Sequence, residues 1–88
     1  MSKIKKLRER IFEKPVRKDI TIFEVIRLAK AYGCNALTGG NHQIRICHPQ
    51  TGTIIPIPRH GTTVKEAYIF EIQALILEIE SADKEENQ

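Results

Sequence analysis

Apolar side chains recur every three or four residues in three stretches of the chain. This spacing places them along one side of a helix and predicts helices at residues 2–14, 22–32 and 64–79. The third helix has more apolar side chains than one face can hold. We expect Ala67, Tyr68, Ile72, Leu75, Ile76 and Ile79 to face a sheet, and Ile69, Phe70 and Leu77 to lie outside that face. Either the first helix or a protein partner could cover this surplus.

Two of the predicted helices begin with a recognisable capping pattern. Thr21 with Glu24, and Thr63 with Glu66, have the spacing of a capping box, in which each side chain satisfies a backbone N–H of the other residue. Gly33 stands where a residue of left-handed conformation commonly ends a helix. These signals fix the limits of the middle helix better than those of the other two.

Between the second and third helices, the apolar residues alternate as they do in strands. We predict strands at 34–37, 42–48 and 53–58, joined by turns rich in glycine, proline and threonine. Pro56 and Pro58 lie two residues apart, so their missing N–H groups belong to the same side of the third strand. That strand is therefore expected at an edge of the sheet.

The order helix, helix, three strands, helix predicts an α+β fold, with a three-stranded antiparallel sheet packed against helices. Eighty-eight residues with 41% apolar content fit one small domain. We assign 1–18 to a basic N-terminal helix and linker, 19–80 to an α-β-β-β-α domain, and 81–88 to an acidic tail expected to be disordered.

The composition and the first ten residues indicate where in the cell the protein is expected. The charged first ten residues have no signal-peptide pattern, and no apolar run approaches the length of a membrane span. We therefore predict a cytoplasmic protein with reduced thiols. Cys34 and Cys47 are interpreted as small buried side chains, and no cysteine or histidine spacing typical of a metal site is present, so no metal or other cofactor is expected.

Positive charge is concentrated at the N-terminus. Residues 1–18 contain eight basic and two acidic side chains, which gives a net charge of +6, against +3 for the whole chain. The segment could be an ordinary solvated helix face, or it could contact nucleic-acid phosphates, with Lys5 and Lys6 among the contacts.

Three histidines are the candidates for chemistry. His42 follows Gly40 and Asn41, residues that tolerate unusual backbone conformations, and it could transfer a proton or be an idle loop residue. His60, next to Arg59, could contact phosphate, act as a second proton-transfer group or only shape the turn before the last helix. His48 precedes a proline and is expected to be a solvated turn residue.

The stretch "GGNHQIRICHP", the hairpin turn that follows, "IIPIPRHG" and a closing helix resemble the HicA family of bacterial mRNA-interferase toxins. The resemblance covers residues 3–80. It implies a fold like that of a double-stranded RNA-binding domain and cleavage of mRNA without the ribosome. It also implies one essential histidine, which is His42 here, and a HicB-type antitoxin that covers the active site.

The residues around His42 are our candidates for further roles in this reaction. Gly40 and Asn41 would shape an RNA-binding turn, and Arg45, Arg59 and His60 would contact the phosphate. Two features depart from the family. Gln43 stands where many members have a second histidine, and the last helix has Lys65 alone among glutamates where many members have several cations.

We therefore expect an endoribonuclease toxin that uses metal-independent acid and base chemistry and is neutralised by its antitoxin. The alternative is a non-catalytic RNA-binding module, or an inactive family member, on the same fold. A third interpretation is a protein-interaction domain that uses the surplus apolar surface of the last helix. The oligomeric state stays open, a homo-oligomer included.

Overall fold

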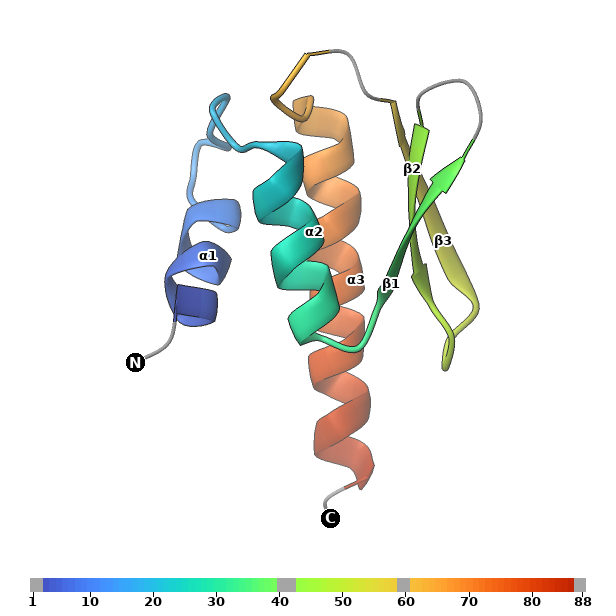
Figure 1. Ribbon diagram of the computed structural model, residues 1–88. Coiled ribbons are helices and arrows are strands. Elements are labelled where there is room, and N and C mark those ends of the chain that lie inside the picture. The colour runs from blue at the N-terminus through green and yellow to red at the C-terminus, as the bar shows by residue number, and fades with distance from the viewer. Residues whose placement is uncertain (1–2, 40–42, 59–60, 87–88) are drawn as a thin grey trace.

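The computed structural model describes residues 3–39, 43–58 and 61–86 (Figure 1). The elements follow the order α1 (Lys3–Ile11), α2 (Ile22–Ala31), β1 (Asn35–Gly39), β2 (Gln43–His48), β3 (Thr53–Pro58) and α3 (Glu66–Glu86). The three strands form one antiparallel sheet in the order β1-β2-β3. The predicted α+β class, the sheet and the position of β3 at its edge are confirmed.

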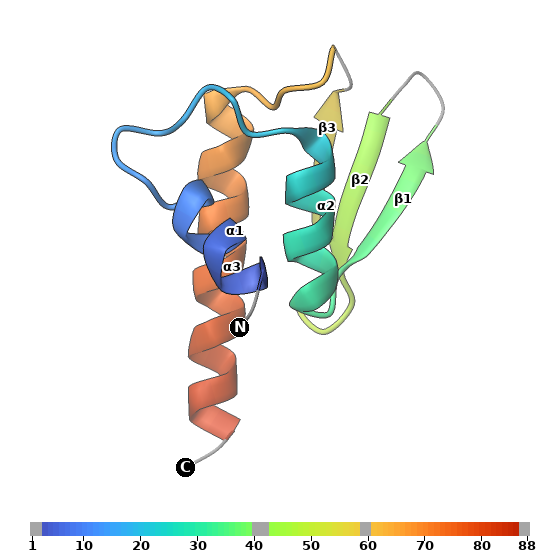
Figure 2. The ribbon, with the colours of Figure 1, turned by 60° about the vertical axis from the view of Figure 1, so that its left-hand side comes forward.

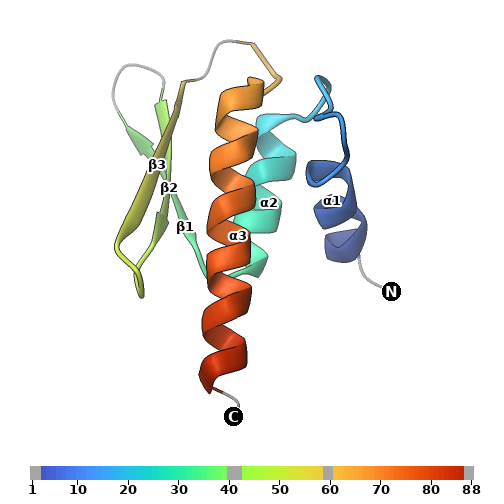
Figure 3. The ribbon, with the colours of Figure 1, turned by 180° about the vertical axis from the view of Figure 1, so that it is seen from behind.

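The molecule has two layers, with the sheet on one side and the helices on the other (Figures 1 and 3). The helices α2 and α3 lie against one face of the sheet, and α1 lies beyond them, on the side away from the strands (Figure 2). The opposite face of the sheet is covered by no described element. A half-covered antiparallel sheet should alternate buried and exposed side chains along each strand.

The strands show that alternation. In β2, Ile44 and Ile46 are buried, whereas Arg45 between them is exposed. In β3, Ile55 and Ile57 are buried, whereas Pro56 is exposed. Register supports the same division, because the inward pairs Ile44–Ile57 and Ile46–Ile55 are direct neighbours across the two strands. The period-two pattern of the sequence therefore predicted correctly which side of each strand is buried.

The helix α2 begins and ends close to its predicted limits. Thr21 accepts a hydrogen bond from the backbone N–H of Glu24, and the Glu24 carboxylate accepts one from the N–H of Thr21, which completes the capping box. Gly33 follows the helix with φ +85°, a conformation that costs a glycine little and most other residues more. Local sequence signals thus define this helix at both ends.

The start of α3 differs from the prediction. Thr63 pairs with Thr21 as an isolated antiparallel bridge, in which the N–H of Ile22 donates to the Thr62 carbonyl and that of Val64 donates to the Ile20 carbonyl. The helix begins only at Glu66, so the predicted Thr63 cap is wrong. The Thr62 carbonyl and the Val64 N–H, on either side of Thr63, bond to residues around the start of α2, so this segment pairs like a strand where the prediction had started a helix.

The inner face of α3 was also predicted imperfectly. Ile69 is completely buried in the core, although the spacing had placed it outside, and Ala67 is exposed. Phe70 and Leu77 are about half exposed, at 53% and 51%, as their predicted positions outside the sheet-facing side suggest. The helix also continues to Glu86, through most of the segment for which we expected disorder.

The helix α1 is shorter than predicted and belongs to the folded body. Leu7 and Ile11 are buried in the same cluster as the inward side chains of α2 and α3. The Gln73 side chain of α3 donates a hydrogen bond of 2.7 Å to the carbonyl of Ile11, which is the last residue of α1. This bond satisfies a carbonyl that the end of a helix leaves without a partner.

Candidate functional site

At one end of the sheet, the ends of the three strands lie side by side, and the predicted catalytic residues adjoin these strand ends in the sequence. Gly39, the last residue of β1, pairs with Gln43, the first of β2, and Gln43 pairs with Pro58, the last of β3. We call this row the Gln43 end of the sheet. Both α2 and α3 also begin at this end of the molecule (Figure 1). Segments distant in sequence therefore converge beside one row of residues.

Five predicted site residues lie outside the described residues: Gly40, Asn41, His42, Arg59 and His60. His42 is bonded to Gln43, and Arg59 is bonded to Pro58. Because Gln43 and Pro58 are neighbours in the register, the two undescribed segments adjoin the same end of the sheet. The predicted hairpin of the second and third strands already implied this proximity, and the register identifies the paired residues.

A hollow of about 280 Å³ adjoins this end. It is lined by Pro58 from the end of β3, Thr63 and Lys65 from the segment before α3, and Tyr68 from the first turn of α3. A second hollow of about 260 Å³ shares Thr63 and Lys65 and adds Lys18, Val64 and Glu66 to its lining. The first hollow therefore combines a lysine with hydroxyl groups next to the end of β3, and the second combines two lysines with the Glu66 carboxylate.

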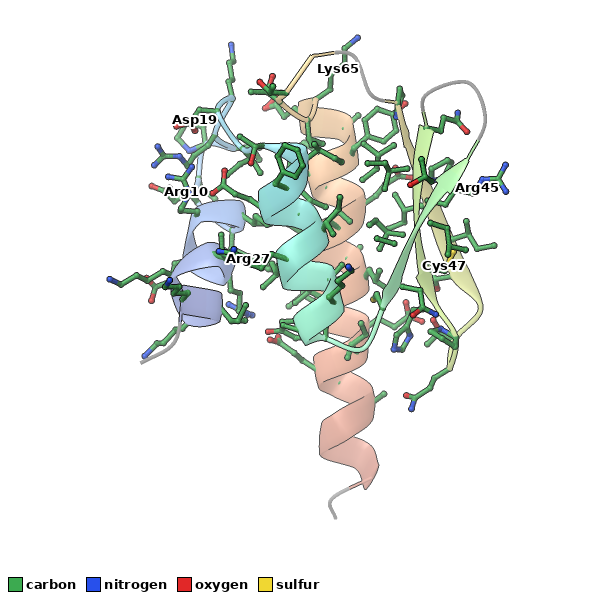
Figure 4. The ribbon with its side chains drawn as sticks, in the orientation of Figure 1. Arg10, Asp19, Arg27, Arg45, Cys47 and Lys65 are labelled. Carbon is green, nitrogen blue, oxygen red and sulfur yellow. The ribbon has the colours of Figure 1, made fainter. Side chains whose placement is uncertain are left out.

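Lys65 was missed as a site residue because the sequence shows it as one cation in an acidic helix. In the structure it precedes α3 and lies at the same end of the molecule as the limits of β2 and β3 (Figure 4). It makes no ion pair with any residue in the described ranges. The available signal was its position at the start of the helix that follows the third strand.

Arg45 lies on the uncovered face of the sheet, two residues along β2 from the Gln43 end. Its side chain points away from the helices (Figure 4). The register places it between Leu37 and Pro56, which are both exposed. No ion pair links it to a residue that the structure describes. Two residues of strand span about 7 Å, so Arg45 is within reach of a ligand bound at the Gln43 end.

The arginines of the N-terminal segment have carboxylate partners instead. Arg8 forms two parallel hydrogen bonds, of 2.8 and 2.9 Å, with Glu80 of α3. The Tyr32 hydroxyl donates a third hydrogen bond, of 2.7 Å, to Glu80, and the Arg8 guanidinium lies 4.4 Å from the centre of the Phe12 ring. Hydrogen bonding to Glu80 is the main cause that raises the pKa of Arg8. This bidentate geometry joins α1 to α3.

Two further arginines are held in the same way. Arg10 donates a hydrogen bond of 2.7 Å to Glu24, and Arg17 donates hydrogen bonds of 2.8 Å to both Asp19 and Glu13. Burial alone would raise the pKa of Glu24, but hydrogen bonds from Arg10 and from Thr21 lower it. The Arg17 hydrogen bonds lower the pKa of Asp19 to about 2. Much of the +6 charge is therefore balanced within the folded chain.

Lys5 and Lys6 are exposed on α1, and the structure does not bring them to the Gln43 end. The helices α2 and α3 stand between α1 and the sheet (Figures 1 and 3). A hollow of about 460 Å³ also lies on this side, lined by Leu7 of α1 and by Phe23 and Arg27 of α2. Its lining has no connection with the segments that contain the predicted catalytic residues.

The prediction for His48 is wrong. His48 ends β2 as a buried residue, 4% exposed, and its Nδ1 atom is 2.9 Å from the Thr51 hydroxyl. Thr51 in turn donates a hydrogen bond to Thr53, and the N–H of Gly52 donates one to the His48 carbonyl. His48 shares its strand side with Ile44 and Ile46, so period-two alternation continues to the end of β2. Its ring holds the β2–β3 turn.

A scan against family models and searches of curated proteins and of solved structures found no match to this chain.

The two cysteines lie in different environments. Cys34 is buried, and burial raises the pKa of its thiol, whereas Cys47 is half-buried on the outer side of β2. The described part of the chain contains no group of three or more histidine, cysteine, aspartate or glutamate side chains arranged to hold a metal ion. Among the same residues, no helix is long and apolar enough to span a membrane.

Proposed function

We propose that this protein is an endoribonuclease toxin of the HicA type, with His42 as its catalytic base and a HicB-type antitoxin as its natural inhibitor. The proposal includes a fold related to double-stranded RNA-binding domains, with α1 as an addition. The main support is the register row of Gly39, Gln43 and Pro58, because it makes the segments that contain His42 and His60 neighbours at one end of the sheet.

The reaction that fits these residues is cleavage of RNA through its own 2′-hydroxyl. A base removes the 2′-hydroxyl proton, the oxygen attacks the adjacent phosphorus, and an acid protonates the departing 5′-oxygen. A histidine near neutral pH suits the first role, and a positioned proton-transfer group contributes about 10²- to 10⁴-fold in rate. In this scheme His42 is the base.

The acid must come from another residue, because Gln43 follows His42 and cannot transfer a proton. His60 is our candidate, since it lies two residues beyond Pro58 in the sequence and Pro58 is the register partner of Gln43. The role requires that the two rings approach the same phosphate from opposite sides of the scissile bond. This arrangement would give a bell-shaped dependence of rate on pH.

Negative charge on the phosphorus centre requires cations nearby. Arg59 is the candidate closest to His60 in sequence, and Lys65 and Arg45 are described cations without a described carboxylate partner. Such groups stabilise a transition state in which charge accumulates on the nonbridging oxygens. Gly40 and Asn41 would let the backbone approach the RNA closely.

The uncovered sheet face offers a path for the RNA strand away from the cleavage point. Arg45 would contact a phosphate there, with Leu37 and Pro56 beside it as apolar neighbours. Lys5 and Lys6 lie on the far side of the helical layer. They would reach only an RNA long enough to pass around the molecule, so we assign them a secondary role.

Induced expression with and without the histidine tests the proposal. The unchanged protein should arrest growth and shorten cellular mRNA, and co-expression of a cognate HicB-type antitoxin should restore growth. His42→Ala should abolish arrest and mRNA loss while its melting temperature stays unchanged. His60→Ala should reduce cleavage strongly without preventing RNA binding.

The alternative function gives a different result. A non-catalytic RNA-binding module would bind RNA at low salt and leave it intact, in the unchanged protein as in His42→Ala. Equal toxicity of the unchanged protein and His42→Ala would contradict the catalytic role of this histidine.

A further inference from the structure

The helix α3 is apolar on two opposite sides. Its inner side contributes Ile69, Ile72, Ile76 and Ile79 to the core, and all four are buried. Successive residues of a helix turn by 100°, so Ala67, Phe70, Ala74 and Leu77 share the side opposite to these isoleucines. All four are exposed, and we call them the outer stripe of α3.

No described element covers the outer stripe. In Figure 3, which views the molecule from behind, α3 lies nearest the viewer and no described element lies in front of it. The helix α1 meets α3 along a different side, through Gln73 and Glu80. Of the two alternatives for the surplus, the first helix therefore does not cover Phe70 and Leu77, which stay 53% and 51% exposed.

Charge beside the stripe restricts what can bind there. Glu66, Glu71 and Glu78 are exposed on α3 and form no ion pair with a residue in the described ranges. From residue 66 to residue 83, α3 contains no lysine or arginine. A nucleic acid would be repelled by this surface, because its phosphates would face carboxylates.

The same charges disfavour a second copy of α3 as the occupant. Whether two α3 helices paired parallel or antiparallel, the residues flanking one stripe would meet glutamates of the other, with no cation on either helix between residues 66 and 83. Like charges at such positions oppose association and select other partners. A ligand that fits the outer stripe is therefore apolar at its centre and positively charged along its sides.

We propose that the outer stripe of α3 binds an amphipathic helix of a partner protein, with lysine or arginine flanking the apolar face of that helix. Phe70 and Leu77 supply the apolar contacts, at the spacing by which helices commonly recognise each other. Ala67 and Ala74 are small, so the two helix axes can approach to about 8–10 Å. Glu71 and Glu78 select the basic flanks. This surface does not depend on the ribonuclease proposal.

A pair of synthetic peptides measures this selectivity directly. Both are 18-residue amphipathic helices with the same leucine face, one with lysine and arginine along its flanks and the other with glutamate at those positions. Fluorescence anisotropy with the full-length protein should show binding of the basic peptide and at least tenfold weaker binding of the acidic one. Equal affinity for both peptides, or no binding of the basic one, would overturn the proposal.

Three variants locate the binding site, and one of them is a control. Phe70→Ser should weaken binding of the basic peptide at least tenfold, and the matched change Phe23→Ser, at a phenylalanine of α2 that is 66% exposed, should leave it unchanged. Glu71→Lys together with Glu78→Lys should transfer the preference to the acidic peptide. The reverse ranking of the two serine variants would contradict the assignment, as would self-association of the unchanged protein that Phe70→Ser abolishes.

Discussion

The N-terminal helical region and the uncovered face of the sheet differ in whether their arginine side chains are paired with carboxylates. Residues 1–18 contain eight of the fourteen lysine and arginine side chains, but Arg8, Arg10 and Arg17 each hold a carboxylate at 2.7–2.8 Å. The described strands contain one cation, Arg45, and it has no described ion-pair partner. The three arginines among the eight cations of residues 1–18 are thus paired with carboxylates, whereas the arginine of the described strands is not.

This difference matters because a phosphate binds a cation more weakly when a carboxylate already occupies its hydrogen bonds. Arg8 is fixed by Glu80 on one side and by Phe12 on the other, so contact with a phosphate would require it to give up a bidentate pair. Arg45 gives up no such contact within the described part of the chain. The comparison predicts that changes in the helical region act on stability and that changes on the sheet face act on binding.

The largest predicted effect is the loss of packing between α1 and the body. Ile11 is 1% exposed within the common core, so Ile11→Ala removes buried methyl groups and leaves a cavity. We expect the free energy of unfolding to fall by about 2–5 kcal/mol, measured by urea denaturation. A fall below about 0.5 kcal/mol would show that α1 is not part of the cooperative fold.

The matched control is Ile54→Ala on β3, which removes the same side chain from the uncovered sheet face. Ile54 is 60% exposed, so we expect a change in unfolding free energy within about 0.5 kcal/mol. The contrast between two identical substitutions measures how differently the two regions contribute to stability.

The next effect is loss of the carboxylate that joins three side chains. Glu80→Ala removes the partner of Arg8 and of Tyr32. Arg8 and Glu80 are about one-third exposed, so solvent weakens their attraction, and we expect a loss of about 1 kcal/mol. A double-mutant cycle with Arg8→Ala measures the coupling, which high salt should reduce. A coupling of zero would mean that the pair contributes nothing to the position of α1.

The smallest effect on stability is predicted for the exposed cation of the sheet. Arg45→Ala should change the free energy of unfolding by less than about 0.5 kcal/mol. Affinity for a single-stranded RNA should nevertheless fall, and the slope of log affinity against log salt should decrease in magnitude by about 0.7, as expected for one lost phosphate contact. Lys6→Ala, on α1, is the control and should leave that slope unchanged for a short RNA. If Lys6→Ala has the larger effect, the comparison between the regions fails.

Local patterns predicted most of the fold. The capping box of α2, the inward side of β2 and β3, and the edge position of β3 all depend on residues a few positions apart, which is the range that sequence spacing describes. The errors have two sources, a contact between distant segments and a strand whose alternation continues further than expected. Thr63 pairs with Thr21 instead of capping α3, and His48 is buried against the β2–β3 turn instead of solvated.

The candidate site was also predictable only in part. His42 and His60 are conspicuous in the sequence because each lies next to a glycine-containing turn, and the predicted pairing of the second and third strands already implied that their segments adjoin one end of the sheet. Lys65 was overlooked because its significance depends on the end of β3 lying beside the start of α3, which its place in the sequence only suggests. The sequence alone also could not show that Glu80 and Glu24, from other helices, pair with two of the arginines of residues 1–18.

The most direct test of the account measures the cleavage rate of a short RNA by purified protein in excess EDTA. The unchanged protein should produce ends with 2′,3′-cyclic phosphate and 5′-hydroxyl groups, and His42→Ala should lower the rate at least 100-fold at an unchanged melting temperature. The account would be contradicted if His42→Ala cleaved as fast as the unchanged protein, or if a substrate with 2′-deoxyribose at every position were cut equally well.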